Sequence, residues 1–192
     1  LMRMLTTLIK PTDGEILWDG QDVFKMDGQY RKLLGYLPQD FGYYPDFSIY
    51  DYLMYIASIK GIRPAAAKER VKLLLKQVGL FRARHKKMKN LSGGMKRRAG
   101  IAQAMLNDPK ILILDEPAAG LDPGGRREIL GGVKKYARES GTNVIIVSHS
   151  MEDMAMYCDD LVVMASGKVL MHAPCAEVFS RADELIAVGL GV

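Results

Sequence analysis

The stretch LSGGMKRRAGIAQAMLNDPKILILDEPAAGLD, residues 91–122, decides how we interpret the rest of the chain. It places a Ser-Gly-Gly turn before a segment with helical spacing, then an unbroken apolar run that ends in two carboxylates, then a short loop that ends in Asp122. Helix starts and strand ends of these kinds are where α/β proteins bind phosphates and metal ions. The pattern therefore predicts an α/β fold that handles a nucleotide triphosphate.

The turn supplies a candidate phosphate site. Ser92 stands where the N-cap of the following helix would be, and Gly93 and Gly94 leave their backbone N–H groups uncovered. A helix N-terminus with bare amides binds anions, phosphate above all. A capped helix after a tight turn is the more common explanation of such a turn alone, so this interpretation depends on the motifs that follow it.

The apolar run supplies candidate catalytic groups. Residues 111–114, ILIL, lack alternation, which is typical of a parallel strand buried on both faces, and Asp115 and Glu116 stand at its carboxyl end. We expect Asp115 to hold Mg²⁺ through its water shell and Glu116 to orient or deprotonate an attacking water. A solvated Asp-Glu pair is common at the end of one strand, but not between LSGG upstream and AGLD downstream.

These residues together resemble a known family. LSGGM is similar to the signature motif of ABC-type ATPases, ILILDE to their Walker B strand, and residues 119–122, AGLD, to their D-loop. The resemblance implies an α/β fold of the P-loop NTPase type, with a parallel-sheet core, a β-hairpin layer and an α-helical lobe. It also implies ATP and Mg²⁺ as cofactors, bound with the help of Ser92, Gly93, Gly94 and Asp122. The family works as a head-to-tail dimer, in which one protomer's signature faces the γ-phosphate held by the other.

Two further side chains resemble parts of the same machinery. Gln39 follows the strand pattern GYLP and precedes an aromatic loop, as in the Q-loop, whose amide oxygen contacts Mg²⁺ or the attacking water and whose loop moves with the transmembrane partner. His149 follows residues 143–148, which we expect to be a buried strand, and resembles the switch histidine that bonds the γ-phosphate. We expect Gln39, Asp115, Glu116 and His149 to converge on one hydrated magnesium ion.

The remaining chain predicts one ABC ATPase domain, residues 1–192, in three parts. Residues 1–40 form core and β-layer, residues 41–106 the α-helical signature lobe, and residues 107–192 the core with Walker B, D-loop and switch histidine. Periodicity and breakers predict helices over residues 1–9, 30–34, 49–60, 65–78, 123–139 and 151–159, hairpins around Asp19-Gly20 and Ser166-Gly167, and an amphipathic tail over 181–188. We expect Trp18 and most of the tyrosines at 50, 52 and 55 to pack in cores, and any exposed tyrosine to line a groove for a permease helix.

Composition limits the classes of function. With 192 residues, 48% of them hydrophobic, the chain can bury one sizeable core, but no apolar run approaches membrane-spanning length, so a membrane role needs a partner. The net charge of +5 is spread over short clusters, which favours a solvated basic face over nucleic-acid binding. Cys158 and Cys175 fit no metal spacing and are interpreted as reduced thiols.

One motif of the family is absent from this sequence. No G-x-x-x-x-G-K-[ST] loop is present, although that loop provides most of the grip on the β- and γ-phosphates, so we expect this polypeptide alone to bind ATP poorly. The chain opens at Leu1, without a signal peptide, and residues 1–16 resemble the segment that directly follows the loop in ABC ATPases. We therefore expect a fragment cut just after it.

The resemblance divides between two branches. Up to about Leu114, residues 35–57 and 91–104 are similar to ATPases of ABC-2-type exporters, whereas residues 115–136, 144–155 and 176–192 are similar to ATPases of energy-coupling-factor importers. Recombination or a sequence-assembly join could each produce such a switch.

Three functions remain open from the sequence. The first is a transport ATPase subunit, peripheral on the cytoplasmic face of the membrane and bound to a permease and a second ATPase protomer, identical or not. The second is an ABC ATPase without a transporter, disfavoured because only a short segment without heptads separates Gln39 from Ser92. The third is a catalytically incompetent module that offers only its signature in trans.

Overall fold

The computed structural model describes residues 1–190, so the last two residues of the importer-like segment 176–192 lie outside the described residues. The chain divides into two units, with the boundary between Ile146 and Val147, and each unit is described by itself. Among the described residues, no helix combines the length and the apolar character needed to cross a lipid bilayer.

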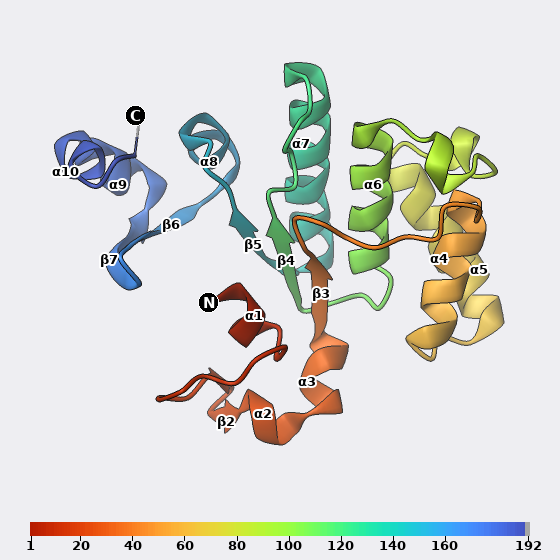
Figure 1. Cartoon of the computed structure of the whole chain (residues 1–192), viewed down its shortest axis with the longest axis horizontal. Coiled ribbons are helices and arrows are strands. Elements are labelled where there is room, and N and C mark those ends of the chain that lie inside the picture. The colour runs from red at the N-terminus through yellow and green to blue at the C-terminus, as the bar shows by residue number, and fades with distance from the viewer. Residues whose placement is uncertain (191–192) are drawn as a thin grey trace. The chain divides into compact units, whose positions relative to one another are not determined.

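A three-stranded sheet forms the centre of the first unit (Figure 1). Its strands are β3 (Leu34–Leu37), β4 (Ile111–Asp115) and β5 (Asn143–Val147), in the order β3-β4-β5. Strands β3 and β4 are parallel, with Leu34 opposite Ile111 and Leu37 opposite Leu114. The first four residues of β4 are buried, which confirms the interpretation of the apolar run as a buried parallel strand.

The prediction that β5 is buried is wrong. Asn143 and Ile145 are exposed, Ile145 by 40%, and the other three residues of the strand are only half-buried. The reason is the strand order, because β5 lies at the edge of the described sheet whereas β4 has a neighbour on each side. A run of β-branched residues predicts a strand, but its position in the sheet depends on residues far away in the sequence.

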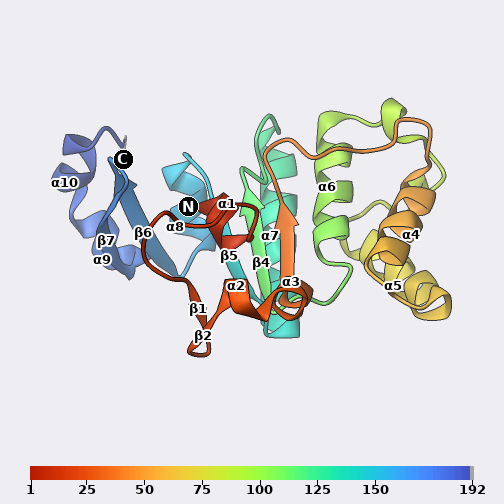
Figure 2. The same ribbon diagram turned by 60° about the horizontal axis from the view of Figure 1, so that its bottom comes forward.

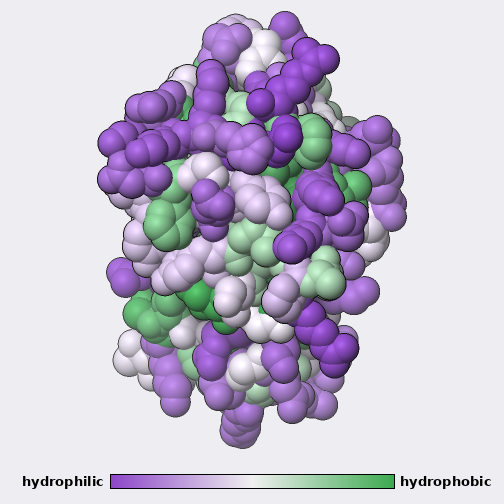
Figure 3. Space-filling model, turned by 90° about the vertical axis from the view of Figure 1, so that its right-hand side faces the viewer, coloured by the Kyte–Doolittle hydropathy of each residue, from purple (hydrophilic) through white to green (hydrophobic). Residues whose placement is uncertain are grey.

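The two long helices before the signature turn lie within one residue of their predicted ranges, 49–60 and 65–78. The helical lobe contains α4 (Ile49–Ile59), α5 (Pro64–Gln77), the 3₁₀ helices η1 (Phe81–Ala83) and η2 (Met88–Asn90), and α6 (Gly93–Ala104). Its core includes the fully buried Tyr52, whose hydroxyl shares its hydrogen between the Gly42 carbonyl, at 3.1 Å, and the side-chain oxygen of Gln103. Burial raises the pKa of Tyr52 to about 12. The face of the lobe in Figure 3 is largely hydrophilic, with hydrophobic residues gathered in patches.

The N-terminal segment forms a smaller layer. Helix α1 (Met2–Leu5) is shorter than the predicted 1–9 because Thr7 adopts a left-handed φ of 58°, which ends the helix. Strands β1 (Leu17–Trp18) and β2 (Gln21–Asp22) form the predicted hairpin, followed by α2 (Val23–Met26) and α3 (Gly28–Leu33). Trp18 packs against a cluster around Val23, as expected of a core residue.

Helix α7 (Pro123–Ser140) has the ends that its sequence predicts. Pro123 occupies the first turn, and Gly141 caps the other end with a φ of 67°, a conformation that suits glycine. The buried side chains of Ile129, Val133 and Tyr136 join the core that also contains α4, α5 and α6.

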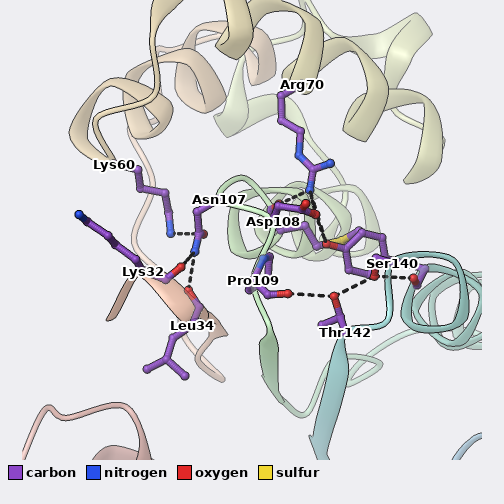
Figure 4. A network of polar contacts seen from close by, with 11 residues as sticks. Lys32, Leu34, Lys60, Arg70, Asn107, Asp108, Pro109, Ser140 and Thr142 are labelled. Atoms are coloured by element: carbon purple, nitrogen blue, oxygen red, sulfur yellow. Dashed lines mark hydrogen bonds and ion pairs between the residues drawn. The ribbon is translucent and has the colours of Figure 1, made fainter. Parts of the chain in front are cut away.

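A polar network fastens the lobe to the amino-terminal edge of the sheet (Figure 4). The guanidinium of Arg70 on α5 donates to the Met105 carbonyl at 2.8 Å and pairs with Asp108 at 3.0 Å. The amide of Asn107 donates to the carbonyls of Lys32 and Leu34 at 2.8 and 2.9 Å, and Thr142 donates to the Pro109 carbonyl at 2.9 Å. The starts of all three strands are therefore held by polar contacts.

The second unit is a hairpin with three helices (Figure 2). Its elements are α8 (Met151–Tyr157), β6 (Asp160–Ala165), β7 (Lys168–Pro174), α9 (Cys175–Ser180) and α10 (Ala182–Ala187). Strands β6 and β7 are antiparallel and turn at Ser166-Gly167, as predicted. Val163, Met171, Val178 and Leu185 form its core, so the amphipathic tail buries one residue of its apolar face in this unit.

Two glycine substitutions should have opposite effects on stability. Gly131, in the middle of α7, has open space where a Cβ would lie, so Gly131→Ala should stabilise the fold by about 0.5–1 kcal/mol through helix propensity. In β3, a Cβ at Gly35 would overlap the backbone oxygen of Ala104, so Gly35→Ala should destabilise it by about 1–3 kcal/mol. Thermal and urea unfolding check both values. Equal effects of the two variants would contradict the close approach of α6 to β3.

Candidate functional site

The carboxyl ends of β3 and β4 bring three predicted site residues to one edge. Because Leu37 lies opposite Leu114 in a parallel pair, Gln39 follows β3 at the level where Asp115 ends β4 and Glu116 begins the next turn. Gln39 is exposed, and Asp115 and Glu116 are half-buried. This edge is where ligands bind in open α/β sheets.

Arg97 on α6 joins the two strand ends, although it is not among the site residues predicted from the sequence. One guanidinium nitrogen donates to the carbonyls of Pro38 and Gln39 at 3.0 and 2.8 Å. The other donates to the carbonyl of Glu116 at 2.6 Å and to that of Asp115. One signal could have found it: Arg97 is four residues before the buried Ile101, and a cation on the buried stripe of a helix needs polar partners.

The charge of Arg97 is held in a protected position. Only 7% of the surface of Arg97 is exposed. Burial lowers the pKa of the guanidinium below its ordinary value, and the carboxylates of Asp115, Glu116 and Asp40 act in the opposite direction. An arginine nevertheless remains charged at neutral pH. The positive charge therefore lies close to Asp115, the predicted magnesium ligand, and to Glu116, which is predicted to activate water.

Glu116 has an unusual backbone. Its φ is +49°, in the left-handed region that non-glycine residues seldom adopt, at a cost of about 1–3 kcal/mol. The Glu116 carbonyl accepts from Ala119 N at 3.1 Å as well as from Arg97. Such conformations persist where the surroundings impose them, and they cluster at functional sites.

The oxygen donors at this edge suit a magnesium ion. Among residues 1–190, no three His, Cys, Asp or Glu side chains gather in a way that could hold a metal by themselves. Mg²⁺, however, binds one or two protein oxygens and keeps waters and phosphate oxygens as its other ligands. The Asp115 carboxylate and the Gln39 amide oxygen fit that requirement, and their roles stay predictions.

The signature turn has the predicted cap. Ser92 Oγ accepts from Met95 N at 3.3 Å, and α6 begins at Gly93. Ser92 and Gly93 are exposed, and the first amides of a helix have no partner within it. A Cβ on Gly94 would lie 3.0 Å from the side chain of Leu121, so the signature turn packs against the D-loop.

Asp122 and His149 were also predicted to lie at the nucleotide. The Asp122 carboxylate accepts from Gly124 N and Gly125 N at 3.1 and 3.3 Å, so it caps α7, and its contact with nucleotide stays a prediction. His149 follows β5 but belongs to the second unit, so its predicted approach to Glu116 stays a prediction.

Three aromatic rings cluster where the loop after Gln39 meets α4. The centroid of the Tyr44 ring lies 5.1 Å from those of both Phe47 and Tyr55. Tyr44 and Tyr55 are 47% and 38% exposed, whereas Tyr52 is buried and Tyr50 is half-buried against the core. The expectation that Tyr50 and Tyr52 pack in the lobe is confirmed, and Tyr55 remains as exposed aromatic surface.

Comparison with known proteins gives consistent matches. The family model described as ABC transporter matches residues 1–119. The energy-coupling factor transporter ATP-binding protein EcfA2 of Clostridium perfringens is 37% identical, covering 98% of this chain and 68% of the relative. EcfA2 of Symbiobacterium thermophilum is 39% identical, covering 100% and 68%. An uncharacterized ABC transporter ATP-binding protein of Bacillus subtilis, YxlF, is 37% identical, covering 88% and 55%.

A solved structure matches the fold of the whole chain. The structure of cbiO1 from Clostridium perfringens, described as part of the ABC transporter complex cbiONQ, superposes with a TM-score of 0.85 at 31% identity. The match covers 100% of this chain and 78% of the other. The predicted P-loop NTPase fold is thereby confirmed.

Proposed function

We propose, since this chain belongs to the ABC transporter family, that it couples ATP hydrolysis in a head-to-tail dimer to transport by a membrane permease. It is an ATP-binding subunit of the ABC transporter class, with the ATPase fold of that family. The observation that best supports the proposal is the edge where Gln39, Asp115 and Glu116 lie at the ends of neighbouring strands and Arg97 bonds the backbone carbonyls of all three.

Each of the four predicted site residues has a proposed task. Asp115 and Gln39 would hold Mg²⁺, which when bound neutralises developing charge on the phosphate oxygens. Glu116 orients the attacking water and accepts its proton, and His149 hydrogen-bonds the γ-phosphate and fixes the water.

The signature would act on the nucleotide of the partner protomer. Ser92 and Gly93 are exposed at the start of α6, where backbone amides and the helix dipole favour an anion. Leu121 packs beside Gly94, so the D-loop with Asp122 would lie at the same protomer contact. We propose that two copies, or this chain and a related ATPase, bind head to tail through these surfaces.

The permease would bind at the aromatic rings of the lobe. Tyr44, in the loop after Gln39, and Tyr55, on α4, offer exposed aromatic surface beside the half-buried Phe47. A permease helix packed on these rings could move the loop that carries Gln39. We propose attachment in this way to the cytoplasmic face of the membrane. In this proposal, residues 1–114, which resemble exporter ATPases, determine which permease the chain binds. Residues 115–192 resemble importer ATPases and do not contact the permease at these rings.

The phosphate-binding loop is the remaining requirement. The motif G-x-x-x-x-G-K-[ST] does not occur in residues 1–192. We propose that sequence outside these residues supplies the motif. The alternative is a module that contributes only its signature in trans. A start codon and this motif in the genomic sequence upstream would eliminate the alternative.

Purification of the natural full-length protein that contains residues 1–192 tests the proposal. We expect it to copurify with its permease and to hydrolyse ATP, and we expect residues 1–192 alone to show no measurable saturable ATPase activity, because the loop that grips the phosphates is missing. Steady-state phosphate release measures both. Robust activity of residues 1–192 would overturn our account of the phosphate grip.

A further inference from the structure

We propose that Arg97 is a positioning residue for ATP hydrolysis: its guanidinium bridges the backbone after β3 to the backbone after β4 and so sets Glu116 relative to Gln39. The inference rests on the proposed function, because it assigns a task within the same site. Arg97 does not touch the nucleotide in this proposal. It acts through the main chain of the two residues that would.

The geometry requires an arginine rather than any cation. Two nitrogens of one guanidinium donate to four carbonyls on two separate segments, those of Pro38 and Gln39 after β3 and those of Asp115 and Glu116 at the end of β4. The planar guanidinium fork holds its donors in fixed directions, whereas a lysine ammonium is a compact point charge on a flexible stem. A lysine here could keep the charge, but it could not span both loops in the same way.

The backbone of Glu116 explains why such a bridge matters. A glutamate at a φ of +49° tends to relax toward the common regions unless neighbouring groups hold it. The Glu116 carbonyl is fixed from two sides, by Arg97 and by Ala119 N. Without Arg97, the turn would relax and the carboxylate would move, and displacement of a catalytic group by about 1 Å can cost a hundredfold in rate.

Close packing places Arg97 beneath this edge. A Cβ on Gly100 would lie 2.7 Å from the side chain of Leu37 and 3.0 Å from the ring of Phe41, so α6 passes directly against the segment that contains Gln39. The helix that begins at the signature turn therefore also carries the bridge. Its close approach leaves the guanidinium little freedom to choose other acceptors.

Arg70 provides a matched control at the opposite edge of the sheet (Figure 4). Its guanidinium also bonds a backbone carbonyl, that of Met105, and it also holds helix and loop together. Its side chain is 21% exposed, and its partners lie before β4 rather than after it. Arg70→Lys should therefore loosen the fold without changing the site.

The test compares Arg97→Lys, Arg97→Met and Arg70→Lys in the natural full-length protein. We expect both Arg97 variants to bind ATP within about threefold of wild type and to lose at least about tenfold in kcat, because an interaction that sets the catalytic geometry has been removed. Arg70→Lys should lower the melting temperature but keep kcat within about twofold. The split between kcat and ATP affinity separates positioning from general loss of structure.

Hydrogen exchange without nucleotide gives a second readout that does not need activity. In both Arg97 variants, the amide of Ala119, which bonds the Glu116 carbonyl, should exchange at least about tenfold faster, and in Arg70→Lys it should not change. Unchanged kcat or unchanged Ala119 exchange in both Arg97 variants would overturn the inference. Absence of ATPase activity in the wild-type protein would instead count against the proposed function.

Discussion

Replacing Glu116 by glutamine is expected to cut ATP turnover by roughly a hundredfold or more while leaving ATP binding intact, as for the loss of a positioned general base. Glutamine has nearly the same shape as glutamate but cannot accept the proton of the attacking water. The bonds that Arg97 makes at this position go to the backbone carbonyl, so the side-chain change leaves them in place. The loss should therefore appear in kcat and not in affinity.

The measurement is phosphate release by the full-length protein, together with equilibrium binding of ATP. Glu128→Gln is the matched control, because Glu128 is an exposed carboxylate on α7 that pairs with Arg98 and not with the site. It should keep kcat within about twofold, as is typical of surface changes. Near-normal turnover of Glu116→Gln would end the assignment of this carboxylate as the base.

The elements around the site could be predicted because their signals are local. The unbroken apolar run of β4, the cap at Ser92 and the Pro and Gly that bound α7 each specify one structure through nearby chemistry. The exposure of β5 was mispredicted because it depends on which strands lie beside it. Thr7 ended α1 early, and no strong breaker marks that position in the sequence.

The site was predictable where residue type determines the chemistry. Asp115, Glu116 and Gln39 carry functional side chains next to strand patterns, and their common edge follows from parallel pairing. The role of Arg97 could not be predicted in this way, because its partners are backbone carbonyls. Every residue has a backbone carbonyl, so no pattern of side chains identifies these partners. The left-handed turn at Glu116 is a property of the fold and has no signature in residue type.

Replacing Gly93 by aspartate is expected to abolish turnover, by a hundredfold or more, while leaving the protomer folded. A Cβ at Gly93 meets nothing, and an acidic residue in the first turn of a helix is favourable to the helix dipole, so α6 should keep its stability. The same carboxylate would repel the γ-phosphate that the signature is proposed to meet. Gly93→Asn introduces a side chain of the same size without the charge, so its loss of turnover should be at least about tenfold smaller than that of Gly93→Asp.

Because the signature would serve the partner's nucleotide, two inactive variants should rescue each other. A mixed dimer of Glu116→Gln and Gly93→Asp contains one doubly defective site and one site that combines an intact Glu116 with an intact Gly93. Coexpression with two affinity tags and tandem purification isolates this dimer, which should recover up to about half of wild-type turnover if its two sites work independently. If each protomer used its own signature, every site would carry one defect, and a mixed dimer no more active than its parents would contradict the head-to-tail arrangement.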